Sequence, residues 1–468
     1  MSDFTMTIGG EQVAAPETFE VVNPATGAPH AQAPACSPAQ LDDAMAAAAA
    51  AFPAWRADPD ARRAALSAAA ARLREHAREL AVILTAEQGK PLGSATVEVF
   101  GTAMWLQYFA DLALPREILQ DDEKAFTEVV RRPLGVVAAI TPWNFPLALA
   151  SWKLGPALLA GNTVVLKPSP HTPLATLRMG DLLRDVLPPG VLNVVSGPDP
   201  LGAAITAHEV PRKISFTGSV ATGRAVAAAA APRLKRVTLE LGGNDPAILL
   251  DDVDAAAVAD KVFEAAFANN GQVCSAIKRV YVPESRYAEV VEALAQRAGE
   301  AVVGPGTEEG VDLGPVGNLP QFERVRELVS AALDGGAKAA AGGRALDRPG
   351  YFHEPTVLAD VTDGSRIVDE EQFGPVLPVV AYRDLDDAVA RANATHFGLS
   401  GSVWGADPER ATAVAARLEC GTAWVNTHLV LAPHLPFGGV KQSGIGVENG
   451  PWGVHGCTDL QVLHTARG

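Results

Sequence analysis

The sequence predicts an α/β fold with parallel sheets in at least two domains. Its 468 residues are two to three times the usual length of one domain, so we expect more than one hydrophobic core. Short β-rich runs alternate with helical stretches along most of the chain, which is typical of parallel sheets covered by helices. With 48% hydrophobic and 20% charged residues, the chain can bury these cores.

Helices dominate residues 37–112. Leucines recur there at helix-compatible spacing with Arg or Glu between them, at Leu66, Leu73, Leu80 and Leu84. After these packing helices, residues 120–124 read as a short charged linker, and residues 126–132 alternate enough to form an exposed strand.

Two groups of strands follow. The first group comprises residues 135–141, 163–167, 191–195 and 213–216, and the second comprises residues 247–250, 279–282 and 376–382. The Gly-Gly-Asn-Asp-Pro segment that begins at Gly242 lies between the groups and reads as a linker. We therefore expect the second α/β domain to begin near residue 242.

Charge and cysteine content exclude several classes of protein. The chain has 38 Lys and Arg against 54 Asp and Glu, and the net charge of −16 would repel nucleic acid. Its four cysteines lie far apart without a CxxC pair, which argues against a zinc ribbon or a disulfide framework. We expect no metal, no nucleic-acid partner and a cytoplasmic location.

No membrane segment or targeting signal is expected. The N-terminus lacks a basic segment followed by an apolar core. The longest uncharged stretch, residues 134–152, is long enough to cross a bilayer. However, Gly135, Pro142, Asn144 and Pro146 divide it into a strand, a loop and a helix start, and a loop in lipid would leave backbone groups without partners.

A strand that runs into a glycine-bearing turn predicts a nucleotide site. Residues 213–224 read KISFTGSVATGR. Gly218 lets the chain turn tightly, and Ser219 can cap a helix whose free N–H groups attract a pyrophosphate. Gly223 would allow close helix packing or approach of a cofactor. Because the spacing is not GxGxxG, a purely structural turn is the alternative.

Lys167 ends another buried strand, at the sheet edge where ligands bind in α/β folds. It could contact ribose hydroxyls, or it could be a solvated lysine at a strand end.

Three further side chains could carry chemistry. Cys274 follows a helix in a polar turn, where a lowered pKa would activate a thiolate. Glu240 ends an apolar strand, where burial would raise the carboxyl pKa and favour a general base. The amide of Asn144, held on a loop between two prolines, could stabilise an oxyanion, although capping of the next helix is the alternative.

Together these segments resemble the NAD(P)-dependent aldehyde dehydrogenase superfamily over nearly the whole chain. The motifs are, in order, TPWNFP at 141–146, GNTVVLKPS at 161–169, FTGS at 216–219, LELGG at 239–243, GQVC at 271–274, EEQFGP at 370–375 and PFGGVKQSG at 436–444. The resemblance implies two Rossmann-like parallel-sheet domains and a small β oligomerisation element. These would be an NAD(P)-binding domain (1–112 and 134–241), a catalytic domain (242–440) and a bridging element (113–133 and 455–468).

The resemblance also implies a mechanism. Cys274 would attack the aldehyde, and the Asn144 amide and the Cys274 backbone N–H would hold the oxyanion. After hydride transfer to the nicotinamide, Glu240 would activate the water that hydrolyses the thioester. Lys153 and Glu448 correspond to proton-relay positions.

For the cofactor, the resemblance implies contacts from Thr141, Pro142, Trp143, Lys167, Ser169, Gly218, Ser219, Gly223, Leu241, Glu371 and Phe373. Many NAD-preferring members carry Glu three residues after the lysine, whereas this chain has Pro170, which removes a charge hostile to a 2′-phosphate. Both NAD and NADP are therefore candidates, with NAD favoured.

The resemblance implies pocket walls at Phe145, Leu149, Trp152, Ala268, Val273, Leu431 and Phe437. Because some relatives carry aromatic side chains in place of Ala268 and Leu431, we expect a roomy apolar tunnel for a medium aliphatic or aromatic aldehyde. No Arg or Lys is evident in these walls, which disfavours a carboxylate-bearing substrate. His428 would add a polar contact or be a plain loop residue.

A homodimer or homotetramer is also implied, because residues 126–132 and 458–464 resemble the element through which two subunits pair. Three alternatives remain. A CoA-acylating dehydrogenase is disfavoured by Glu240, and a cysteine hydrolase would use Cys274 with a histidine. A non-catalytic binding protein is disfavoured by the intact Asn144, Glu240 and Cys274.

Overall fold

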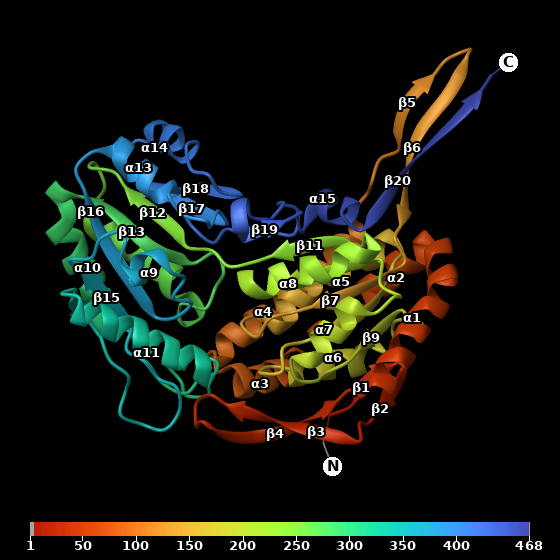
Figure 1. Ribbon diagram of the computed structural model, residues 1–468, viewed down its shortest axis with the longest axis horizontal. Helices are drawn as coiled ribbons and strands as arrows, with labels where there is room; N and C mark the ends of the chain where they lie inside the picture. Colours follow the sequence, from red (N-terminus) through yellow and green to blue (C-terminus); the bar gives the residue numbers. More distant parts are fainter. Residues whose placement is uncertain (1–3, 468) are drawn as a thin grey trace.

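The computed structural model describes residues 4–467. Two α/β layers lie side by side, and a β arm projects away from them (Figure 1). The first sheet contains, in spatial order, β19 (Gly444–Ile445), β11 (Arg236–Glu240), β10 (Lys213–Thr217), β7 (Val136–Ile140), β8 (Thr163–Lys167), β9 (Leu192–Val194), β1 (Met6–Ile8) and β2 (Glu11–Val13). Its strands β11 to β9 are parallel, which agrees with the Rossmann-like fold expected from the sequence.

The second sheet contains, in spatial order, β14 (Lys338–Ala341), β15 (Thr356–Ala359), β16 (Val376–Tyr382), β13 (Ile277–Pro283), β12 (Asp245–Leu249), β17 (Ser400–Trp404) and β18 (Thr422–Val425). The expected boundary at residue 242 falls between β11 and β12, but Asp245 and Pro246 already belong to β12. The chain also returns to the first sheet at β19, beyond residue 440.

The N-terminal helical region is divided by short breaks into α1 (Pro38–Ala57), α2 (Pro59–Glu75), α3 (Ala77–Gln88) and α4 (Leu92–Asp111). Asp58 ends α1 and caps α2, because its side chain accepts a hydrogen bond from the Ala61 N–H. Gly89 ends α3 in the left-handed conformation with φ 96°.

Helices cover both faces of the sheets. Those of the first sheet are α5 (Pro146–Ala160), α6 (Leu174–Leu183), α7 (Pro200–Ala207) and α8 (Val220–Ala230), with the 3₁₀ turn η1 (Ala231–Arg233). Those that follow are α9 (Ala255–Phe267), η2 (Ala268–Gly271), η3 (Glu284–Arg286), α10 (Tyr287–Glu300), α11 (Leu319–Asp334), α12 (Arg366–Asp369), α13 (Leu385–Asn393), α14 (Pro408–Ala415), η4 (Lys441–Ser443) and α15 (Gly450–His455). Within residues 4–467, none of the helices combines the length and apolar character needed to cross a membrane.

The projecting arm consists of β5 (Glu117–Asp121), β6 (Ala125–Pro133) and β20 (Thr458–Ala466), with β6 in the middle (Figure 1). The expectation of a linker at 120–124 is wrong, because this stretch ends β5 and closes a hairpin. Asp122 explains the turn, since its Oδ1 accepts hydrogen bonds from the backbone N–H groups of Lys124 and Ala125. A further hairpin of β3 (Glu17–Asn23) and β4 (Ala28–Ala35) was not expected from the sequence.

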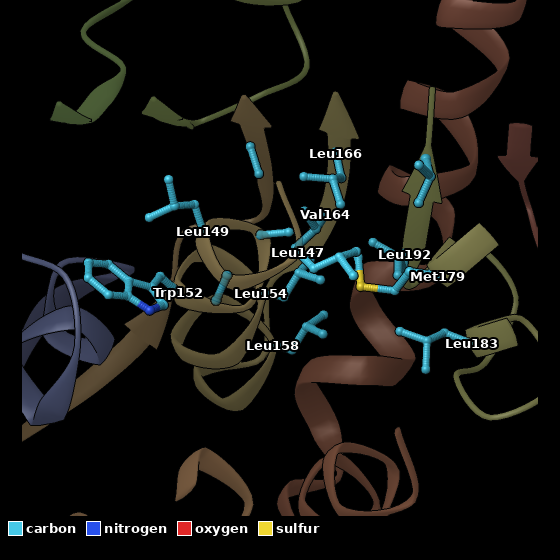
Figure 2. Packing of buried hydrophobic residues seen from close by; sticks show 14 of the residues in the cluster. Leu147, Leu149, Trp152, Leu154, Leu158, Val164, Leu166, Met179, Leu183 and Leu192 are labelled. Carbon is cyan, nitrogen blue, oxygen red and sulfur yellow. The ribbon is translucent and has the colours of Figure 1, made fainter. Parts of the chain in front are cut away.

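The core of the first layer is built around α5. Figure 2 shows Leu147, Leu154 and Leu158 of this helix facing Val164 and Leu166 of β8, all of them buried. Helix α5 also packs closely on α4 at Gly155, where a Cβ atom would lie 2.2 Å from the ring of Phe109. Helices α4 and α5 are therefore in direct contact in the second half of α5.

Replacement of Gly155 by alanine is expected to lower the stability of the protein. The gain of about 1 kcal/mol from helix propensity is outweighed by the steric overlap with Phe109, which costs about 1–3 kcal/mol or more at such a distance. Gly299→Ala in α10 is the matched control, because no atom of residues 4–467 outside its own helix lies within 4 Å of the added Cβ. Thermal unfolding should show a lower midpoint for Gly155→Ala and an unchanged or higher midpoint for Gly299→Ala. Equal midpoints for the two variants would contradict this packing.

Candidate active site

Several predicted site residues gather where the strands of the first sheet end. In parallel sheets, the loops after the carboxyl ends of adjacent strands lie together and form the ligand site. The loop after β7 carries Asn144 to the start of α5. Pro146 begins that helix, at a position where its missing N–H costs nothing. Glu240 is the last residue of β11, which β10 separates from β7 in the sheet.

The loop that carries Cys274 comes from the other layer. After α9, the residues Asn269, Asn270 and Gly271 all adopt left-handed conformations with φ of 48°, 61° and 73°. Gly271 is needed here, since a Cβ would lie 2.1 Å from the Gly374 carbonyl oxygen. This sharp turn directs Cys274 back toward the first sheet.

Gln272 anchors this loop, and sequence reasoning missed it. Its Oε1 accepts a hydrogen bond from Gly317 N at 2.7 Å, and its Nε2 donates to the carbonyl of Asn269 at 2.8 Å. Asn144 Nδ2 in turn donates to the Gln272 carbonyl at 2.8 Å. The Asn144 side chain does not cap α5, because Phe145 occupies the N-cap position, so the helix-cap alternative for Asn144 is wrong.

A buried ion pair supports the same loop and was also missed. Lys90 Nζ donates to the Asn144 carbonyl at 2.8 Å and pairs with Glu98. The other carboxylate oxygen of Glu98 accepts from the N–H groups of Leu147 and Ala148 at the start of α5. The GKP segment around Lys90 was a sequence signal, but its partner could not be identified without the fold.

A cavity of about 1170 Å³ lies on one side of Cys274. Of the expected pocket residues, Phe145, Leu149, Trp152, Ala268, Val273 and Leu431 line it, and Trp105, Phe263, Phe267 and Leu429 add further apolar wall. The cavity is therefore wide and largely apolar near the cysteine, as the resemblance implied.

Phe437 and His428 lie behind this wall, which corrects the expectation that they form it. Phe437 packs edge-on against Trp152 with ring centroids 5.3 Å apart. His428 packs against Trp424, and its Nε2 lies 2.8 Å from the carbonyl oxygen of Ser275. Burial lowers the pKa of His428 to about 3, so the ring is neutral at physiological pH.

A second cavity of about 590 Å³ lies on the other side of Cys274. Seven residues of the expected cofactor set line it: Pro142, Trp143, Gly218, Ser219, Leu241, Glu371 and Phe373. Glu240 lines it as well, together with Gln321, Arg324, His396 and Phe397, which sequence reasoning did not identify.

The glycine-bearing turn forms as expected. Ser219 caps α8, since its Oγ accepts a hydrogen bond from Thr222 N at 3.2 Å. Gly223 serves close packing rather than cofactor approach, because a Cβ there would lie 2.5 Å from the Leu241 side chain. The helix thus presents its free N–H groups and positive end toward the cavity, which suits a pyrophosphate.

Thr141, Lys167 and Ser169 lie at the ends of β7 and β8, outside the lining of this cavity. Ser169 Oγ accepts from His171 N at 3.2 Å, and Lys167 Nζ donates to Pro168 O at 3.1 Å. Burial lowers the pKa of Lys167 to about 8. Thr141 Oγ1 is buried and has no hydrogen-bond partner within residues 4–467, so a polar ligand group would satisfy it.

The two cavities meet at one place. Asn144, Leu149 and Cys274 line both of them. The cysteine is therefore reachable from the apolar cavity and from the cavity beside the α8 N-terminus, while Glu240 faces it across the second cavity.

The electrostatics of Cys274 differ from the sequence expectation of a lowered thiol pKa. Burial raises the pKa of the Cys274 thiol well above its usual value, and the nearby Glu240 carboxylate raises it further. Lys278 opposes these effects from below the loop, where its Nζ donates to the carbonyls of Val273 and Cys274. The resting cysteine is consequently a thiol that needs a base.

Glu240 has the electrostatics expected of such a base. Burial first, and then the charge of Glu448, raise the pKa of the Glu240 carboxyl well above its usual value. Neither of its oxygens has a hydrogen-bond partner in the described part of the chain. Lys153 and Glu448 lie together beneath it, with Nζ and Oε1 2.6 Å apart.

Across residues 4–467, His, Cys, Asp and Glu side chains nowhere form a group of three that could hold a metal ion.

Comparison with known proteins shows similarity over nearly the whole chain. The model of the aldehyde dehydrogenase family matches residues 12–463. A phenylacetaldehyde dehydrogenase from Pseudomonas fluorescens is 40% identical, over 98% of this chain and 95% of that protein. An NADP⁺ succinate-semialdehyde dehydrogenase from Escherichia coli is 37% identical, over 96% of this chain and 94% of that protein. The NAD⁺ complex of an aldehyde dehydrogenase from Bacillus cereus is 36% identical and superposes with a TM-score of 0.96, over 99% of this chain and 96% of that one.

Alkylation of Cys274 should reveal its raised pKa. Only the thiolate reacts with iodoacetamide, so the rate at this residue should be low at neutral pH. It should keep rising beyond about pH 9.5, where an ordinary thiol, with a pKa of about 8.5, has levelled off. Peptide mass spectrometry can measure the rate at Cys274 separately from the other cysteines. A rate that reaches its plateau near pH 7 would show a lowered pKa instead.

Proposed function

The chain belongs to the aldehyde dehydrogenase family, and we propose that this NAD(P)-dependent enzyme oxidises apolar aliphatic or aromatic aldehydes of medium size to carboxylic acids. The observation that carries the proposal is the position of Cys274 at the junction of the two cavities. We assign the apolar cavity to the aldehyde and the cavity beside the α8 N-terminus to the nucleotide.

In the first step, Glu240 takes the proton of the Cys274 thiol, and the sulfur forms a bond to the aldehyde carbon. The carbonyl oxygen then becomes an oxyanion. One N–H of the Asn144 amide is used by Gln272, so the second is free to hold this oxyanion together with the Cys274 backbone N–H. A bound nicotinamide supplies the acceptor for the hydride that leaves the same carbon.

Before the second step, Glu240 releases the proton taken from Cys274 to solvent. It then removes a proton from water, and the resulting hydroxide attacks the thioester on Cys274. The carbon–sulfur bond breaks, the acid leaves, and the proton held by Glu240 passes to the sulfur and restores the thiol. A carboxylate that lacks hydrogen-bond partners within residues 4–467 can accept protons at both oxygens. Its raised pKa brings it closer to the operating pH, where a general base is most effective.

The substrate class follows from the apolar cavity. Aromatic walls such as Trp105 and Trp152, whose rings stack 5.8 Å apart, suit a flat apolar group. Contrary to the sequence expectation, a lysine does lie in the wall, but the charge of Lys90 is neutralised by Glu98.

The rim of this cavity is acidic, with the exposed carboxylates Glu264, Glu308, Glu309 and Asp312. Arg297 at the rim is engaged by Asp260 and Glu300. These charges disfavour aldehydes that carry a carboxylate, such as semialdehydes.

For the cofactor, we propose that NAD is used in preference to NADP. Pro170 removes a carboxylate that would repel a 2′-phosphate, and Lys167 lies nearby. However, the exposed Asp199 interacts with Lys167 and keeps negative charge at this position. Among the relatives, both an NAD⁺ complex and an NADP⁺ enzyme occur, so a preference rather than exclusive use is expected.

The remaining assignments also belong to this proposal. Residues 1–112 and 134–241 would form the nucleotide domain, residues 242–440 the catalytic domain, and residues 113–133 and 455–468 the bridging element. In the arm, β20 exposes Leu460, Val462 and Leu463. Apolar side chains on a strand at a sheet edge suit pairing with a second copy of the chain, so we propose a homodimer or a dimer of such dimers.

A single assay, which follows the absorbance of the reduced nicotinamide, tests the enzyme class, the substrate and the cofactor together. With phenylacetaldehyde, hexanal and succinic semialdehyde, each with NAD⁺ and NADP⁺ and without CoA, the first two aldehydes with NAD⁺ should give the highest kcat/KM. Cys274→Ala should abolish turnover while NAD⁺ binding survives. A requirement for CoA, or turnover in Cys274→Ala, would overturn the mechanism.

Glu240→Gln should slow the first step and block the second, because Glu240 acts as the base in both. The amide cannot activate water, so the variant should form at most about one NAD(P)H per subunit and then stall, with steady turnover reduced about 10²-fold or more. Rapid-mixing absorbance measures both phases. Unchanged steady-state turnover in this variant would remove Glu240 from its proposed role.

A further inference from the structure

Lys278 is a charged residue in the middle of the second sheet. It is the second residue of β13, which lies between β16 and β12, and its exposed fraction is 1%. Buried parallel strands are normally apolar, and a buried ammonium is costly unless acceptors surround it. Lys278 lines neither of the two cavities, so contact with a ligand there does not explain its position.

The ammonium of Lys278 turns back to the loop that carries the cysteine. Its Nζ donates to the carbonyl of Val273 and, at 3.4 Å, to the carbonyl of Cys274. The ring of Phe373, on the wall of the second cavity, has its centroid 5.4 Å from the same Nζ. One cation therefore holds two consecutive carbonyls, which lie on either side of the Cys274 Cα atom.

The contact with Val273 fixes the direction of an N–H group. The Val273 carbonyl and the Cys274 N–H belong to the same peptide unit, and in a trans peptide they point in opposite directions. The Cys274 N–H therefore points away from Lys278. Within residues 4–467 this N–H donates to no acceptor, so it is available to a ligand.

A turn in the same loop does not do this alone. The N–H of Ala276 also donates to the Val273 carbonyl, at 3.2 Å, and closes the turn. Such a bond does not fix the central peptide of a turn, which here joins Cys274 to Ser275. Lys278 holds the carbonyl of that peptide as well. Its charge also polarises the peptides that it contacts, and a polarised peptide is a stronger N–H donor.

We propose that Lys278 is a positioning residue for the oxyanion. It holds and polarises the peptide between Val273 and Cys274, so that the Cys274 N–H is directed at the oxygen of the reacting aldehyde. This inference rests on the proposed function, in which that N–H and the Asn144 amide share the oxyanion. Lys278 acts through the loop, without contact to aldehyde or nucleotide.

The charge of Lys278 also acts on the thiol itself. Burial and then Glu240 raise the pKa of the Cys274 thiol, and Lys278 opposes them. Burial likewise raises the pKa of Asp245 and Glu371, and Lys278 opposes it in both. Loss of the charge would therefore lower the fraction of thiolate. A comparison of two reactions of the same sulfur cancels this effect, if both need the thiolate and only one forms an oxyanion.

The two reactions are acylation by p-nitrophenyl acetate and alkylation by iodoacetamide, both without nucleotide. In acylation, Glu240 takes the thiol proton, the sulfur bonds to the acetyl carbon, and the carbonyl oxygen becomes an oxyanion. The carbon–oxygen bond then breaks and p-nitrophenolate leaves with its electron pair. Alkylation displaces iodide from a saturated carbon and forms no oxyanion. The first burst of p-nitrophenolate, corrected with Cys274→Ala, measures acylation, and peptide mass spectrometry measures alkylation at Cys274.

Two variants of Lys278 and one control are compared. Lys278→Met removes both the charge and the donor, and Lys278→Gln is a milder variant that keeps a neutral N–H donor. Lys235→Met is the matched control. Lys235 is also buried and holds two backbone carbonyls, those of Thr206 and His208, but it lines neither cavity.

In Lys278→Met, the ratio of the acylation rate to the alkylation rate should fall about tenfold or more. Removal of an oxyanion donor costs about 10²–10³ in rate, and this variant misdirects the donor without removing it. Lys278→Gln should show a smaller fall, and Lys235→Met should keep the wild-type ratio. With aldehyde and NAD(P)⁺, kcat of Lys278→Met should fall while KM stays the same, because the oxyanion forms only during the reaction.

An equal loss of both rates would show that Lys278 acts only on the thiol pKa. An unchanged ratio with a lower midpoint of thermal unfolding would show a purely structural role. Either result would overturn the inference. Because the ratio needs no dehydrogenase activity, it tests Lys278 separately: if the wild-type protein forms no NAD(P)H with any aldehyde, it is the proposed function that fails.

Discussion

The hydrogen bond between Asn144 and the Gln272 carbonyl is the constraint on which the site depends. It joins the loop after β7 in the first sheet to the loop before β13 in the second, so each layer fixes the other. A second hydrogen bond crosses the same junction, since Asn269 Nδ2 donates to the Asn144 carbonyl at 3.0 Å. Lys90 strengthens the same junction from behind, since it holds the Asn144 carbonyl. The reacting sulfur is thus placed by packing between layers rather than by its own loop.

Burial sets the chemistry at this junction, and it acts on acids and thiols in the same direction. It disfavours the charged forms of Cys274 and Glu240 alike, so it raises the pKa of both groups. Polar groups are also buried beside the site, because Lys213, Ser215 and Thr217 alternate with the apolar Ile214 and Phe216 along the buried strand β10.

Much of the fold and of the candidate site could be predicted from the sequence. The strand at 163–167 was predicted with the bounds that the structure has, because a buried parallel strand is a continuous β-branched run between a glycine and a proline. Cys274, Glu240 and Asn144 were chosen from local context and do meet at one junction. The pKa of Cys274 was predicted in the wrong direction, since local sequence reveals neither the burial of the thiol nor the nearby Glu240 carboxylate. The Lys90–Glu98 pair and strand β5 were missed, because charged residues read as solvated when their partners lie elsewhere in the chain.

The two cavities share the walls formed by Asn144, Leu149 and Cys274, and this has a consequence for inhibitors. A compound that fills both cavities must pass the sulfur at its midpoint. Linking an apolar fragment to a nucleotide-like fragment would turn the second binding event into an intramolecular one, with the gain in avidity that a short, well-matched linker brings. A mildly electrophilic linker would then lie beside the only thiol that both fragments approach.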